Sequence, residues 1–111
     1  MYRSISSQEA MVLERTLAVG ATAQVSSATV ASVRNLRVTA SCKCGCATIW
    51  FGPDGDSANG RKIADARATS EGQDIEVLVW SIDDAIVGLE FVGPTPAALP
   101  DPASVRGYGV A

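Results

Sequence analysis

The residues of this chain best suited to chemistry are its three cysteines, Cys42, Cys44 and Cys46, which stand within five consecutive positions. Thiolates bind zinc or copper(I), and a carboxylate or a second chain could complete the shell of ligands. Structural zinc sites, however, typically use about four ligands, with paired cysteines separated by two or more residues. We therefore expect that this spacing does not aim three sulfurs at one point. Cys42 is then a buried core residue, and the other two cysteines fill the end of a hairpin.

The same cysteines also permit a redox function. A disulfide between Cys44 and Cys46 would be strained, whereas the neighbouring Lys43 would lower the pKa of a thiol. The chain has no Cys-x-x-Cys motif, the arrangement in which reactive thiols are often found. A thiol-dependent metal-binding or redox-responsive protein that uses Cys42, Cys44 and Cys46 is therefore our alternative interpretation of the function.

The chain contains no histidine. This absence excludes Ser-His-Asp and Cys-His catalysis, Cys₂His₂ zinc sites and imidazole acid–base chemistry. An enzyme would depend on a carboxylate such as Glu90 or Asp83 as its base, yet neither a nucleophile–base pair nor a phosphate-binding loop is present in the sequence. We therefore favour a non-enzymatic protein without a cofactor, in which Glu90 faces solvent from an otherwise apolar strand.

A second acidic stretch superficially resembles a calcium-binding loop. It reads Asp54-Gly-Asp56, followed by Asn59 and Gly60. Compared with an EF-hand loop, a ligand position holds Ala58 and the glycine comes one place late. The simpler interpretation is a turn built from Asp, Gly and Asn.

The composition is typical of one globular domain and excludes several classes of partner. A chain of 111 residues, of which 47% are hydrophobic, can bury a core without metals or disulfides. Its net charge is −3 and its nine basic residues are scattered, which argues against a nucleic-acid or membrane-surface partner. No apolar run reaches the roughly 18 residues that span a bilayer. Three cysteines are an odd number, so we expect reduced thiols and a cytoplasmic location.

The N-terminal third of the chain is predicted to be helical. Ser6 and Glu9 form a capping-box pattern, and Gly20 is a natural stop, so we predict a helix from Ser7 to about Val19. The segment from Ala23 to Val33 keeps a helical period but is rich in β-branched residues. We predict a second helix there, with a strand as the alternative.

The pattern changes to a period of two at Leu36. Alternation predicts one strand from Leu36 to Cys42 and another around Ile49, joined by a tight hairpin with Gly45 at a permissive position. Three more strands are predicted at residues 63–69, 75–82 and 85–92. A turn at Asp83 and Asp84 joins the last two, and a Pro-rich tail follows from residue 93.

These elements predict a single α+β domain over residues 1–111. Residues 7–33 are helical, 36–92 form the sheet and 93–111 form the tail. Because the connections are short, consecutive strands are expected to pair. The predicted fold is two N-terminal helices packed on one face of a five-stranded, mainly antiparallel meander.

The chain also resembles a group of small uncharacterised bacterial proteins. The resemblance rests on the Cys-x-Cys-Gly-Cys turn at 42–46, on Val87-Gly-Leu-Glu-Phe91 and on the Leu-Pro-Asp-Pro run at 99–102. It covers most of the chain and implies the same α+β layout. It implies no activity, because none is assigned to the group and likeness of fold alone does not supply one.

The last predicted strands are apolar on both faces. If Val77, Val79, Leu89 and Phe91 face the helices, the opposite face is more apolar than a sheet face in water usually is. It would carry Trp50, Leu78, Trp80, Ile82, Ile86 and Val92.

A second subunit, the Pro-rich tail or a ligand could cover this face, and we favour a symmetric dimer. The leading hypothesis is therefore a homodimeric binding or accessory domain that acts through its apolar sheet face, together with Glu90 on the same strands.

Overall fold

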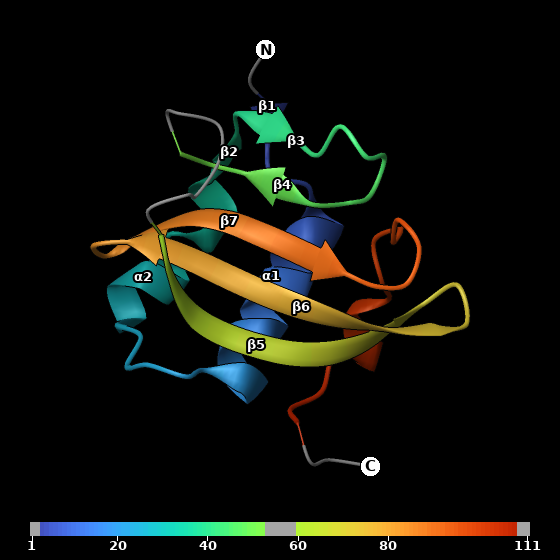
Figure 1. The fold of residues 1–111 in the computed structure, drawn as a ribbon. Coiled ribbons are helices and arrows are strands. Elements are labelled where there is room, and N and C mark those ends of the chain that lie inside the picture. The colour runs from blue at the N-terminus through green and yellow to red at the C-terminus, as the bar shows by residue number, and fades with distance from the viewer. Residues whose placement is uncertain (1–2, 53–59, 109–111) are drawn as a thin grey trace.

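The structure is a computed structural model that describes residues 3–52 and 60–108. It is an α+β fold with a five-stranded antiparallel sheet and a small two-stranded sheet (Figure 1). In chain order the elements are β1 (Arg3–Ser4), α1 (Ser7–Gly20), α2 (Ser27–Ala31), the 3₁₀ helix η1 (Val33–Asn35), β2 (Arg37–Val38), β3 (Ala40–Ser41), β4 (Ile49–Trp50), β5 (Arg61–Ser70), β6 (Gln73–Ile82), β7 (Ala85–Val92) and the 3₁₀ helix η2 (Pro102–Ser104).

Helix α1 begins with the predicted capping box. The Ser6 hydroxyl accepts a hydrogen bond from the Glu9 amide at 3.1 Å, and the Ser6 amide donates to the Glu9 carboxylate at 2.9 Å. The Arg3 guanidinium adds a bidentate pair to the same carboxylate at 2.8 and 2.9 Å. The helix ends at Gly20, where its backbone packs so closely on β5 that a Cβ atom would overlap the carbonyl oxygen of Asp65.

The predicted second helix is wrong in length. The structure has only five helical residues in α2, followed by the turn of η1. Ser26 caps α2 by accepting from the Thr29 amide, and the Ser32 hydroxyl donates to the Thr29 carbonyl at its end. Serine side chains compete for backbone hydrogen bonds in this way and restrict a helix to the residues between them. None of the helices described here is long and apolar enough to span a membrane.

The five-stranded antiparallel sheet is confirmed, but its order is not that of a meander. The strands lie in the order β3-β4-β7-β6-β5, so β4 pairs with β7 and not with β5. The strand predicted from Leu36 to Cys42 is also divided, because β2 pairs with β1 in the small sheet and only β3 joins the large one. The three long strands β5, β6 and β7 are consecutive hairpins, which leaves the outer edge of β7 free for β4.

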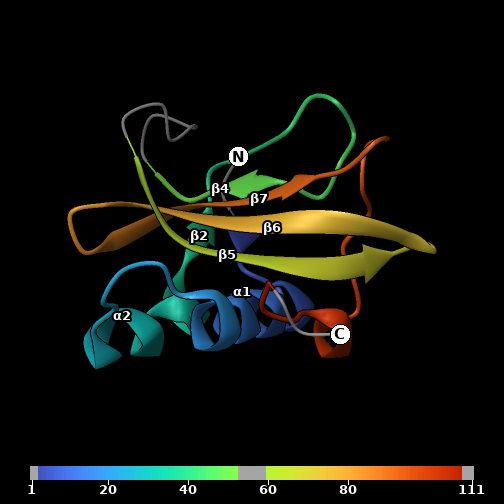
Figure 2. The ribbon, with the colours of Figure 1, turned by 60° about the horizontal axis from the view of Figure 1, so that its bottom comes forward.

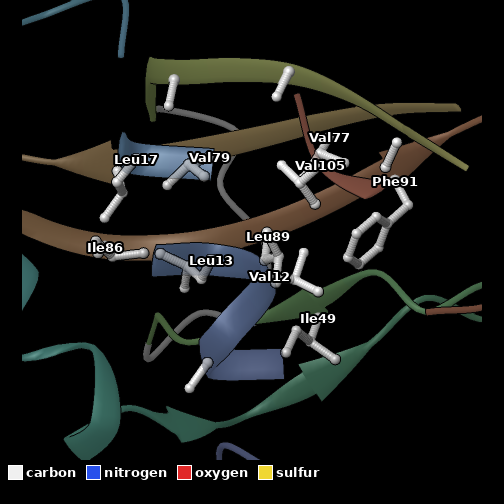
Figure 3. Close-up of a cluster of buried hydrophobic side chains, with 14 of the residues drawn as sticks. Val12, Leu13, Leu17, Ile49, Val77, Val79, Ile86, Leu89, Phe91 and Val105 are labelled. Carbon is white, nitrogen blue, oxygen red and sulfur yellow. The ribbon is translucent and has the colours of Figure 1, made fainter. Parts of the chain in front are cut away.

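The hydrophobic core lies between α1 and one face of the sheet (Figures 2 and 3). Val77, Val79, Leu89 and Phe91 are buried in it, as predicted. The residues of β5 that face α1 include a row of alanines, which permits the helix to approach closely. The core residues of α1 and β5 are Val12, Leu13, Leu17, Ala64, Ala66 and Ala68.

Ile86 lies in this core and not on the opposite sheet face, which corrects the prediction. Trp80 pairs with Gly88 while the next residue, Ser81, pairs with Ile86. Val87 is therefore the extra residue of a β-bulge, and the bulge reverses the side to which the preceding residues point. Only 3% of Ile86 is exposed.

The C-terminal segment packs on the helix side of the sheet instead of crossing the opposite face (Figure 2). Ala97 and Val105 are buried in the core. The backbones of Arg67 and Arg106 exchange two hydrogen bonds of 2.8 Å, so the segment also pairs with the outer edge of β5. The tail is therefore not an extended cover of the outer face, although Tyr108 reaches the edge of that face, where its hydroxyl donates to the Glu76 carboxylate at 3.0 Å.

The capping box makes the stability of the fold depend on pH. The hydrogen bonds from Arg3, opposed by burial and aided by Ser6, hold the pKa of Glu9 below its usual value. The stabilisation is therefore complete above the unfolded pKa of about 4.3 and is lost as the pH falls through the lower folded pKa. We expect Glu9→Gln to lose roughly 1–2 kcal/mol of unfolding free energy at pH 7 and much less near pH 3.

Denaturant unfolding at several pH values measures this difference. Glu14→Gln is the matched control, because Glu14 pairs with Arg34 on the surface of the molecule, where an ion pair contributes about 0–1 kcal/mol. Equal losses for both variants at pH 7 would contradict the role assigned to Glu9.

The close approach at the end of α1 predicts a second stability effect. We expect Gly20→Ala to destabilise the fold by roughly 3 kcal/mol, because the added methyl group meets the backbone of β5, which cannot move aside easily. Gly72→Ala is the control: Gly72 has a φ of +81° but open space around it, so roughly 1 kcal/mol is expected. Thermal unfolding measures both, and a Gly20→Ala protein as stable as the control would refute the contact.

Candidate metal centre

The three cysteines lie in the turn that connects β3 with β4. Ser41 pairs with Ile49, and the Cys42 amide donates to the Thr48 carbonyl at 3.1 Å. The chain therefore reverses over residues 43–47, in a turn wider than the tight hairpin that was predicted. Gly45 has a φ of +91°, which confirms that this position needs the conformational freedom of glycine.

This turn brings the three sulfur atoms together. The Sγ atoms of Cys42, Cys44 and Cys46 all lie within 4.8 Å of one another, and those of Cys44 and Cys46 are 3.0 Å apart. The expectation that the spacing prevents convergence is wrong, because the wide turn folds residues 44 and 46 back toward Cys42. Cys42 is half-buried and not a core residue, since β3 is a two-residue strand at the edge of the sheet.

Each sulfur has one polar neighbour that can stabilise negative charge on it. The Cys44 amide donates to the sulfur of Cys42, and the Cys46 amide donates to that of Cys44, each at 3.4 Å. The sulfur of Cys46 lies 3.2 Å from the Thr48 hydroxyl. Thr48 is itself buried and accepts a hydrogen bond of 2.9 Å from the Phe91 amide, so β7 fixes its position.

These neighbours give the thiols of Cys44 and Cys46 different pKa values. Burial opposes the ionisation of Cys46, but hydrogen bonds from Cys44, Thr48 and Cys42 together lower its pKa to about 7. Hydrogen bonds with Cys42 and Cys46 raise the pKa of Cys44 to about 11. Between Cys44 and Cys46 the first proton therefore leaves near neutral pH, and the negative charge is favoured on Cys46, whose sulfur accepts a hydrogen bond from Cys44.

The cluster borders a shallow hollow of about 260 Å³ whose other wall is the start of the C-terminal segment. The Ala47 amide donates to the Ala97 carbonyl at 2.8 Å and holds this segment beside the turn. Val92, Pro94 and Pro96 line the hollow together with the exposed Thr95. The thiols are thus bordered by the start of the C-terminal segment and open to solvent.

The other predicted site residues lie mostly on the outer face of the sheet, away from α1. Trp50 and Trp80 both pair with Gly88, so two half-buried indoles flank a residue that has no side chain. Ile82 and Val92 are each 42% exposed, and Leu78 is half-buried.

The carboxylates considered as catalytic bases are not brought together. The Trp80 indole N–H donates to the Glu90 carboxylate at 2.9 Å, so Glu90 is half-buried on the outer face. Asp83 lies in the turn between β6 and β7 with a φ of +54°, which confirms the predicted turn. The acidic stretch from Asp54 to Asn59 lies outside the described residues.

The sequence analysis missed Thr48 as a member of the site. Its hydroxyl follows Cys46 by two positions. Residues 43–47 form a turn and not a strand, so alternation does not relate Thr48 to the sulfurs and the sequence offers no local signal for it.

Comparison with protein-family models, with curated proteins and with solved structures gives no match for this chain. The resemblance to small bacterial proteins therefore stays an expectation, and the interpretation of the site depends on its geometry alone.

The hydrogen bond to Thr48 predicts how the thiols react. In the metal-free reduced protein, Cys46 should be the first thiol alkylated by iodoacetamide, with a midpoint near pH 7. Thr48→Val should raise this midpoint and slow the reaction at pH 7, whereas Thr48→Ser keeps the hydroxyl and should react like the wild type.

Mass spectrometry of peptides after timed alkylation measures the reaction at each cysteine, and circular dichroism checks that the variants are folded. The same midpoint in all three proteins would show that Thr48 does not support the thiolate.

Proposed function

We propose that this protein binds one soft metal ion through the thiolates of Cys42, Cys44 and Cys46. The convergence of the three sulfurs within 4.8 Å carries this proposal. A thiolate sulfur lies about 2.3 Å from a zinc ion, so two sulfurs on the same ion are roughly 4 Å apart. The cluster therefore needs only small side-chain movements to enclose an ion.

The type and surroundings of the donors support the same function. Thiolates select soft ions such as copper(I) and zinc over magnesium or calcium. Hydrogen bonds from outside the first shell of ligands orient the donors of a metal site and contribute to its affinity, and here each sulfur has one such neighbour.

The ion is not needed to hold the fold together. The core between α1 and the sheet is buried without any contribution from the three cysteines, unlike a zinc finger, which unfolds when the metal is removed. We therefore propose a carrier or sensor role for the site in preference to a structural one.

Titration of the reduced protein with Cd²⁺ in the absence of oxygen tests this function. Cadmium thiolates absorb in the ultraviolet, so we expect absorption that saturates at one ion per chain. Each Cys→Ser variant should bind at least about tenfold more weakly, whereas Lys62→Ala, which removes a lysine from β5 at the opposite edge of the sheet, should bind like the wild type. Absorption that does not saturate, or that persists when all three cysteines are replaced, would disprove the site.

A second candidate function rests on the outer face of the sheet. We propose that Trp50, Trp80, Ile82 and Val92 form an interface with a second copy of this chain. The apolar surface of these four residues supports the proposal, since burying a large apolar side chain stabilises an association by about 1.5–3 kcal/mol. Twofold dimers are also the commonest homo-oligomers.

Light scattering at micromolar concentrations tests the dimer. The wild type should have twice the mass of one chain, and Ile82→Glu should shift it toward a single chain, because a carboxylate would be buried in the interface. Met11→Glu is the matched control, since Met11 is 43% exposed on α1, on the other side of the sheet. A wild type with the mass of one chain would end this proposal and leave the metal site untouched.

A further inference from the structure

We propose that the ion bound by the three cysteines is monovalent copper, held by three thiolates and without a fourth ligand. This inference rests on the proposed metal-binding function and identifies the class of ion. It follows from two features of the site: the number of donors and the hydrogen bonds to each sulfur.

The number of donors distinguishes copper(I) from zinc. Among residues 3–52 and 60–108, the three cysteines form the only close group of three or more metal-ligating side chains, and no carboxylate belongs to it. A zinc site is almost always four-coordinate and would have to take a water molecule or an outside group as its fourth ligand. Copper(I) is satisfied by three thiolates, so the protein alone completes its shell.

The hydrogen bonds compensate for the excess negative charge of a site in which three thiolates bind copper(I). Three thiolates around a monovalent ion have a net charge of −2, compared with −1 around a divalent ion. The amides of Cys44 and Cys46 and the hydroxyl of Thr48 each face one sulfur at 3.2–3.4 Å. Donors of this kind disperse negative charge on the sulfurs, and charged acceptors strengthen the bonds in return.

The exposed position of Cys44 gives the ion a route in and out. Cys44 is exposed whereas Cys42 and Cys46 are half-buried. An incoming thiolate can therefore bind the copper ion as the Cys44 thiolate leaves it, with no change in the oxidation state of either sulfur or copper. Such exchange suits a protein that accepts and releases copper more than one that stores it permanently.

The test is a competition between the two ions on the intact, reduced protein without oxygen. We expect one Cu(I) per chain, retained against a tenfold excess of Zn²⁺, and X-ray absorption that reports three sulfur neighbours around the copper. Each of the three Cys→Ser variants should weaken the binding of Cu(I) by about 100-fold or more, measured against a competing chelator. Lys62→Ala, on β5 at the opposite edge of the sheet, should retain wild-type affinity, and circular dichroism confirms that each variant is folded.

Two results would overturn the inference while leaving the proposed function intact. One is displacement of copper by zinc in a protein that still binds Cd²⁺ through three thiolates. The other is two-coordinate copper, in which one of the three Cys→Ser variants binds like the wild type. A protein that retains none of the three ions would instead remove the metal-binding function itself.

Discussion

The structure depends on the packing of one helix, α1, against three long strands. The contact is close because β5 presents alanines to the helix and because Gly20 allows the end of α1 to lie directly on the backbone of β5. Val12 and Leu13 are fully buried as a result. Large aliphatic side chains contribute about 1.5–3 kcal/mol each when buried, so this single contact supplies a core that needs no metal.

The same packing determines where the cysteines lie. With β5, β6 and β7 joined by short turns and pressed on α1, the free edge of β7 pairs with β4, and β4 brings the cysteine turn beside the C-terminal segment. Thr48 connects the two regions, since its hydroxyl lies near the sulfur of Cys46 and accepts a hydrogen bond from the Phe91 amide. The cluster is therefore exposed on one side and held through Thr48 to β7 on the other, an arrangement that suits the proposed exchangeable metal site.

Neither edge of the large sheet is available for pairing with another chain, so its outer face is the surface to consider for association. Residues 104–106 pair with the free side of β5, and the opposite edge is the two-residue strand β3. Neither edge offers a long unpaired strand to another chain. An association between copies would therefore use the face that carries Trp50 and Trp80, and Val92 lies both on that face and beside the cysteine hollow.

The sequence by itself determined the elements whose signals are local. The capping box at Ser6 and Glu9, the alternation along β6 and the need for glycine at position 45 were all predicted, because each depends on neighbouring residues only. Tertiary structure decided the rest. The pairing of β4 with β7 depends on which edge remains free, and the bulge at Val87 that turns Ile86 into the core depends on the register between two strands. The convergence of Cys42, Cys44 and Cys46 could not be read from their spacing, because the distance between the sulfurs is determined by the width of the turn and by the strands on either side of it.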